Sequence, residues 1–197
     1  MSAALAELQR IGIKIFAADG VSVRPRELIP IFHRWIQTGA LADQLLIDVA
    51  DYDHVPQGPG VVLVAHEGIF SVDLADDRMG LAYTRKAPVA GSLGDRLRDV
   101  ARTVLNACRL LEEDAALGGR LRFRGDEMHI FANDRLLAPN TAESLAALQS
   151  ALRELVGAAY GDADCAITPD ADRRERLGVR VRAPQAIEIA ELSRRLG

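Results

Sequence analysis

Residues 45–68 read LLIDVADYDHVPQGPGVVLVAHEG, and two apolar, β-branched runs in this stretch flank a short loop. Runs of this kind, bounded by glycine and proline, predict two β-strands, at residues 45–51 and 61–67. Three ionisable residues, Asp48, His66 and Glu67, interrupt the runs. Because a buried charge is costly without a partner, this pair of strands is also the first place to look for a functional site.

The first of these strands has little polar surface on either face, which predicts a central strand buried on both sides. Antiparallel pairing with Tyr52 opposite Val62 would place Asp48 directly opposite His66, within hydrogen-bonding reach. A slip of one residue would put Ile47 there instead and separate the pair. Asp48 and His66 therefore form either a structural pair or part of a site, and the sequence leaves both interpretations open.

The functional interpretation gathers five side chains near the ends of the two strands: Asp48, Asp51, His54, His66 and Glu67. Such a group could serve as general acid and base, or its histidines and carboxylates could bind a divalent metal. The candidate metal ligands are Asp51, His54, His66 and Glu67. The spacing matches no known metal-ligand motif, so a surface turn beside a structural pair is the alternative.

A second candidate site lies where the apolar run at residues 128–132 ends. Asn133, Asp134 and Arg135 follow that run, and Asn140 is expected to begin the next helix. A polar rim at a helix N-terminus favours an anionic ligand. These residues are also common in turns, where their side chains bond to nearby backbone, so the cluster has a structural explanation as well.

Arginines alternate with apolar residues at 120–124 and again at 180–182. The alternation predicts an arginine stripe on one strand face in each segment, which could bind phosphate or an acidic partner. Charges on an edge strand also prevent sheets from aggregating, so this pattern too has two interpretations.

The rest of the chain predicts strands and amphipathic helices in succession. Strands are expected at residues 12–18 and 179–181, and hairpins at 69–73 with 81–86 and at 120–124 with 128–132. Helices are expected at residues 25–38, from Ser92 to Gly118, from Asn140 to Gly161, and from Pro184 to the end. Ser92 and Asp95 have the spacing of a capping box, which fixes the start of the longest helix.

The fold class predicted from these elements is α+β, with a mixed, mostly antiparallel sheet covered by amphipathic helices on one face. The motif IFAAD at residues 15–19 is similar to IFAND at residues 130–134, which suggests an internal β-turn-α repeat with its two helices side by side. Residues 1–161 are expected to form a single core domain. Residues 162–197 would be a strand–helix extension packed on it.

Composition narrows the classes of function. The chain has 197 residues, 49% hydrophobic and 26% charged, which is typical of a folded globular protein. Its apolar runs are too short to span a membrane, and its N-terminus does not resemble a signal peptide, so we expect a cytoplasmic protein with no membrane contact. The net charge of −4 argues against nucleic acid as a partner.

Two functional hypotheses follow from the sequence. The first is a non-catalytic binding or assembly protein that uses its sheet surface for a protein partner, or for a second copy of itself. The second is a small-molecule or metal-binding enzyme, of hydrolase or lyase type, centred on residues 48–67. Convergence of the five candidate side chains in one pocket would favour the enzyme.

Overall fold

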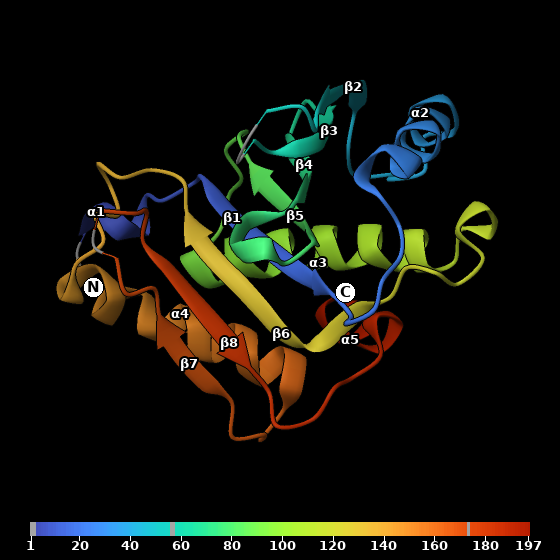
Figure 1. Ribbon diagram of the computed structural model, residues 1–197. Coiled ribbons are helices and arrows are strands. Elements are labelled where there is room, and N and C mark those ends of the chain that lie inside the picture. The colour runs from blue at the N-terminus through green and yellow to red at the C-terminus, as the bar shows by residue number, and fades with distance from the viewer. Residues whose placement is uncertain (1–2, 56–57, 173) are drawn as a thin grey trace.

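The apolar, β-branched runs of the sequence form the strands of one sheet. A computed structural model describes residues 3–55, 58–172 and 174–197. Its eight strands have the order β2-β3-β4-β5-β1-β6-β8-β7, and each neighbouring pair is antiparallel (Figure 1). The strands are β1 (Ile11–Ala17), β2 (Leu46–Tyr52), β3 (Gly60–Ala65), β4 (Gly68–Asp73), β5 (Gly80–Arg85), β6 (Phe123–Ala132), β7 (Ala166–Pro169) and β8 (Gly178–Arg182).

Helices cover one face of this sheet, which confirms the predicted α+β class (Figure 1). The α-helices are α1 (Ala3–Ala6), α2 (Ile29–Thr38), α3 (Leu93–Glu112), α4 (Ala142–Tyr160) and α5 (Ile189–Leu196). Short 3₁₀ turns are η1 (Pro25–Leu28), η2 (Ala75–Asp77) and η3 (Ala115–Leu117). Within the described residues, no helix has the length and apolar character needed to cross a membrane.

Helix α3 is the central packing element, and it begins where the capping box predicts. The Ser92 side chain accepts a hydrogen bond from the Asp95 backbone N–H, and the Asp95 carboxylate accepts one from Ser92 N–H. These bonds satisfy N–H groups that the first turn of a helix leaves unpaired. The buried stripe of α3 packs against β1 and β5, and its flanks contact α4 and α5.

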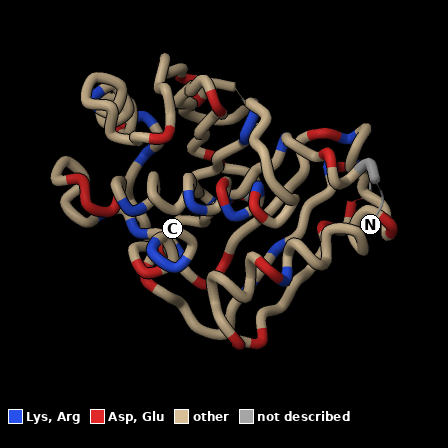
Figure 2. The backbone as a smooth tube through the Cα atoms, turned by 180° about the vertical axis from the view of Figure 1, so that it is seen from behind, with Lys and Arg blue, Asp and Glu red and all other residues tan. Residues whose placement is uncertain are grey.

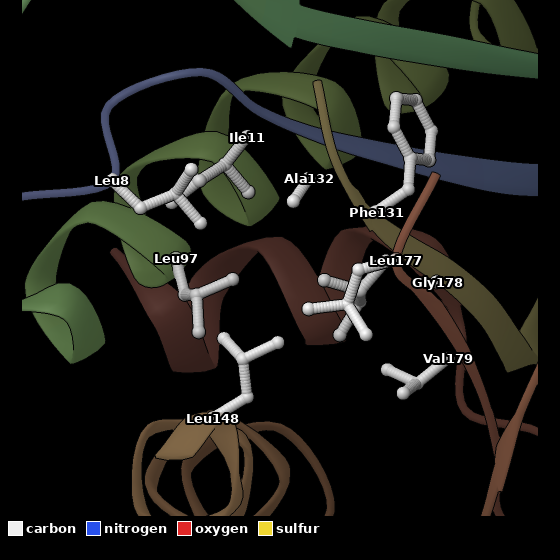
Figure 3. A pocket seen from close by; sticks show the side chains of 10 residues that line it. Leu8, Ile11, Leu97, Phe131, Ala132, Leu148, Leu177, Gly178 and Val179 are labelled. Carbon is white, nitrogen blue, oxygen red and sulfur yellow. The ribbon is translucent and has the colours of Figure 1, made fainter. Parts of the chain in front are cut away.

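The interior is apolar and tightly filled between α3, α4 and the middle of the sheet. Figure 3 shows Leu97 and Leu148 facing Leu177 across a space of about 10 Å³. A space of that size holds about one water molecule at most, so it is a packing gap and not a ligand site. The Phe131 ring points away from these leucines, toward the other face of the sheet.

Strand β2 lies at the end of the sheet, so the prediction of a central strand buried on both sides is wrong. It pairs with β3 alone among the described strands, and the Ile47 side chain is 55% exposed. The apolar composition of β2 indicates a strand but carries no information on its position in the sheet. That position is set by the long-range pairing of β1 with β5 and β6.

The predicted second hairpin is also absent, because residues 123–132 form the single strand β6. Gly125 lies against the backbone of Ile187, and Asp126 O accepts a hydrogen bond from Ala183 N–H. The glycine therefore serves a close approach of two segments, where the sequence had indicated a turn. Residues 120–124 consequently do not form a separate strand with an arginine face.

Three helix predictions need correction in detail. Helix α4 begins after Thr141, whose side chain accepts the cap hydrogen bond from Ser144 N–H, and not after Asn140. The last helix begins at Ile189, after Pro184. The helices after the two repeated motifs are not side by side, because α2 packs against β2 whereas α4 packs against α3 and α5 (Figure 1).

Candidate functional site

The hairpin register differs from the predicted one and separates Asp48 from His66. Asp48 lies opposite Val64, with a β-bulge between Leu46 and Asp48, and Tyr52 lies opposite Gly60. The Asp48 carboxylate is exposed and accepts a hydrogen bond from the neighbouring Val49 N–H at 2.8 Å. The predicted pair of Asp48 with His66 is therefore wrong. The register of the two strands is shifted by two residues from the predicted one, and the bulge shifts the pairing by one more residue at the end where His66 lies.

The four predicted metal ligands are split between the two ends of the hairpin. Asp51 lies opposite Val61, whereas His66 follows the far end of β3, roughly 16 Å away at about 3.3 Å per residue. Asp51 pairs with Arg26 at 3.0 Å, and Glu67 accepts a hydrogen bond from Leu45 N–H at 2.8 Å. His54 is exposed in the turn that follows β2.

These side chains do not converge in one pocket. In the part of the chain that the structure describes, no group of three or more histidine, cysteine and acidic residues is placed to hold a metal ion. The Glu67 carboxylate accepts a backbone hydrogen bond and the Asp51 carboxylate pairs with Arg26, so both carboxylates have a structural role without a metal ion.

The second predicted cluster is held by turn hydrogen bonds. The Asp134 carboxylate accepts hydrogen bonds from the N–H groups of Leu136 and Leu137, both at 3.1 Å. The Asn140 side chain donates to the carbonyl of Asp172 at 3.1 Å, which ties it to the loop between β7 and β8. Asn133 and Arg135 are exposed. These bonds correspond to the structural explanation for the cluster.

A different group of ionisable side chains gathers on the face of the sheet that the helices leave uncovered. Lys14 of β1, His129 of β6 and Arg180 of β8 are aligned in one row across three neighbouring strands. They border a depression of about 310 Å³. We call this the open-face site and define it by Lys14, Asp73, His129, Asp170, Arg176 and Arg180.

Lys14 forms the floor of the open-face site and is only 2% exposed. Its ammonium group donates to the carbonyls of Arg78 at 2.7 Å and Ala75 at 3.3 Å, and lies 3.4 Å from the Asp73 carboxylate. A buried ammonium group needs such partners to offset its lost hydration. Lys14 therefore ties the β4–β5 connection to the centre of the sheet.

His129 and Asp170 form the closest histidine–carboxylate pair at this site, with His129 Nε2 2.7 Å from Asp170 Oδ2. Burial alone would raise the pKa of Asp170. The hydrogen bond with His129 and the positive charges of Arg180 and Arg176 outweigh it, so the pKa lies below its ordinary value. Arg180 Nε is 3.8 Å from the second Asp170 oxygen. Asp170 is thus ionised and held from two sides.

Gly178 makes room for this pair. An alanine Cβ at position 178 would lie 2.0 Å from Asp170 Oδ2 and 2.8 Å from His129 Nε2. Glycine is therefore required for the carboxylate to approach the strand. The loop that carries Asp170 is fixed over the sheet by the same contact.

Arg176 lines the site, with its guanidinium carbon 3.5 Å from the centre of the Phe131 ring. Burial lowers the pKa of Arg176, although the more distant charges of Asp73, Asp170 and Glu175 oppose that effect. Among the described residues, no carboxylate lies within 4 Å of this guanidinium and no hydrogen bond reaches it. Arg176 is stacked and held in place, without an anionic partner of its own.

A neighbouring network on the same face is fully paired. Glu127 is 2% exposed and accepts two hydrogen bonds from Arg78, at 2.7 and 2.9 Å, and one from Arg182 at 3.0 Å. Hydrogen bonds from Arg78 lower the pKa of Glu127 to about 2, with Arg182 adding to the effect and burial opposing it. The Arg78 guanidinium carbon lies 4.0 Å from the centre of the Phe16 ring.

The sequence indicated only part of this face. The alternation of Arg180 and Arg182 correctly placed two arginines on one side of a strand. His129 and Asp170, however, are 41 residues apart, and strand β7 before Asp170 was not predicted. The signal that could have found the pair was Gly178 beside the arginine stripe, since glycine in a strand often marks a close approach.

Comparison with known proteins does not assign the site. No protein-family model matches the chain, and no curated protein sequence matches it significantly.

A double-mutant cycle can test the observed pairing. Removing either side chain of the pair with Asp170→Ala or His129→Ala should destabilise the protein, and the two losses should be non-additive by about 1 kcal/mol because the residues share a hydrogen bond. Urea unfolding of the single and double variants measures this coupling. Asp48→Ala and His66→Ala provide the matched cycle and should be additive. Additivity at His129 and Asp170 would contradict the pairing.

Proposed function

We propose that this protein binds a small anionic ligand, bearing a carboxylate or phosphate group, in the open-face site. The observation that carries the proposal is Arg176, a stacked guanidinium in the wall of a polar depression, with no carboxylate within salt-bridge distance among the described residues. The depression is at the lower end of the volumes of ligand pockets, which fits a small ligand. This places the proposed function in the class of binding proteins.

Among the cationic side chains of the site, Arg176 is the one left to contact an anion, and the carboxylates of Asp172 and Glu175 also line the depression. The Lys14 ammonium group already donates to backbone carbonyl groups and pairs with the Asp73 carboxylate, and Arg180 lies 3.8 Å from Asp170. Asp170 is engaged by His129. Stacking on Phe131 fixes the plane of the Arg176 guanidinium, so its N–H groups could donate to two oxygens of one carboxylate or phosphate.

Exchange of Arg176 for methionine tests this function. Methionine keeps an unbranched apolar stem over Phe131 but removes the charge and all five N–H donors. We expect the affinity for acetate and for inorganic phosphate to fall at least tenfold, because a charge-assisted hydrogen bond contributes about 1.5–3 kcal/mol. Titration followed by ¹H–¹⁵N NMR measures weak binding and locates it, through the signals of residues 128–131 and 174–180.

Arg98→Met is the matched control, since Arg98 is an exposed arginine on α3, on the helix-covered side of the sheet. Its affinities should equal those of the wild type. A preference for phosphate over acetate, or the reverse, would identify the anion class. The proposal would be wrong if neither anion shifts these signals, or if the Arg176 and Arg98 variants bind equally.

A protein partner on the sheet surface is the second candidate function, and one observation favours it. Within the described residues, strand β2 has a neighbouring strand on one side alone, and large apolar side chains in and just before it are exposed: Leu45 by 64%, Ile47 by 55% and Tyr52 by 44%. Charged residues of both signs are otherwise interspersed along the backbone, as Figure 2 shows. An apolar strip at a sheet edge is typical of a surface that another chain covers.

A further inference from the structure

Strand β2 leaves one edge of the sheet open. Its neighbour on one side is β3, and within the described residues no strand lies on the other side (Figure 1). In an antiparallel sheet, alternate residues of such a strand point their N–H and C=O groups outward. Val49 N–H is one of these groups, since it donates a hydrogen bond to the Asp48 carboxylate at 2.8 Å.

The side chains beside this edge supply apolar surface. The β-bulge at Ile47 turns that side chain outward, and Leu45 is exposed just before the strand. Helix α2 packs on the helix-covered side of β2, through buried side chains that include Phe32 and Trp35. A segment added at the edge would therefore extend the sheet and cover Leu45 and Ile47.

The negative charge around β2 indicates whether a second copy of the chain or a different protein would pair with this edge. Residues 43–55 contain four aspartates and no lysine or arginine. Arg26 neutralises Asp51 and Asp53, and Arg102 lies 3.8 Å from Asp43. Asp48 makes no salt bridge within the described chain, so two copies of β2 side by side would bring acidic residues together, and like charges on paired strands are destabilising.

We propose that β2 is a docking edge for an extended segment of another protein in which basic and apolar residues alternate. The added strand would take Val49 N–H as a backbone donor, which releases the Asp48 carboxylate to pair with a lysine or arginine of the segment. Apolar residues of the segment would cover Leu45 and Ile47. This is recognition by strand addition, in which backbone bonds give affinity and side chains give specificity. It rests on the second candidate function and is independent of the open-face site.

The test uses two blocked, fluorescein-labelled hexapeptides, one of alternating lysine and valine and one of alternating glutamate and valine. Fluorescence anisotropy with the full chain should show at least tenfold tighter binding of the lysine peptide. Ile47→Lys should abolish this binding, because a lysine on an edge strand prevents another strand from pairing with it. Asp48→Lys should reverse the preference toward the glutamate peptide. Leu136→Lys is the matched control, because Leu136 is 95% exposed outside β2, and it should bind as the wild type does.

Each other outcome overturns the inference. Absence of binding, or equal affinity for the two peptides, would show that the edge does not recognise a basic segment. Light scattering that finds a dimer dissociated by Ile47→Lys would assign the edge to a second copy of the chain. Arg176→Met should leave peptide binding unchanged, so failure of this inference and failure of anion binding at the open-face site are separately detected.

Discussion

Replacing Gly125 by alanine should lower the free energy of unfolding by about 3 kcal/mol or more, the largest effect of a single methyl group that we expect in this protein. The added Cβ would lie 1.6 Å from the carbonyl oxygen of Ile187 and 2.7 Å from its carbonyl carbon. Because both atoms are backbone atoms, no rotation of a side chain relieves the clash. Strand β6 or the segment before α5 must move, and this movement would weaken the hydrogen bond from Ala183 N–H to the carbonyl oxygen of Asp126.

Gly157→Ala is the matched control and should have the opposite sign. Gly157 lies within α4, and a Cβ there meets no atom within 4 Å. Alanine in an exposed helix interior is about 0.5–1 kcal/mol more favourable than glycine, so this variant should be more stable than the wild type. Chemical unfolding in urea measures both variants. Equal effects of the two substitutions would contradict the close approach at Gly125.

Glu127→Gln should destabilise the protein by about 2–3 kcal/mol at neutral pH, since it removes the charge that two arginines share while keeping the size of the side chain. The value lies below that for a fully buried ion pair because the Arg78 and Arg182 side chains are 31% and 59% exposed. Glu113→Gln removes one exposed partner of Arg109 and should change stability by less than about 0.5 kcal/mol.

The effect of Glu127→Gln should depend on pH with a defined sign. The pKa of Glu127 is lowered from 4.5 to about 2 in the folded protein. The charge of Glu127 therefore contributes fully to the free energy of unfolding above about pH 4.5, and this contribution is lost as the pH falls toward 2. The difference in unfolding free energy between wild type and variant should therefore shrink over this range. A difference that stays constant from pH 6 to pH 2 would show that the charge of Glu127 is not what stabilises the network.

Local signals in the sequence predicted local structure well. The capping box at Ser92 fixed the start of α3, and the apolar runs around residues 69–86 correctly predicted the hairpin of β4 and β5. Both depend on hydrogen bonds between residues close in the chain. Such interactions are determined within the segment, so they can be inferred from it.

The order of strands and the position of the open-face site could not be inferred in this way. An apolar strand such as β2 has the same composition whether it lies at the centre or at the edge of a sheet. Gly125 indicated a turn because the partner that requires glycine, Ile187, is 62 residues away along the chain. The pairing of His129 with Asp170 likewise depends on the alignment of β6 with β8, which only the complete sheet defines.

The place of β1 in the sheet has a consequence for how the chain folds. Strands β2 to β5 form a meander of sequence neighbours, whereas β1 must pair with β5 and with β6, and residue Ile13 meets Ile130 across 117 residues. Closing such a long loop costs entropy before its contacts form, which makes folding slow. Because the chain is made from its N-terminus, β1 leaves the ribosome long before its partners β5 and β6. We expect β1, with its apolar row at Ile11, Ile13 and Ile15, to be the segment most in need of protection from aggregation until β6 has been made.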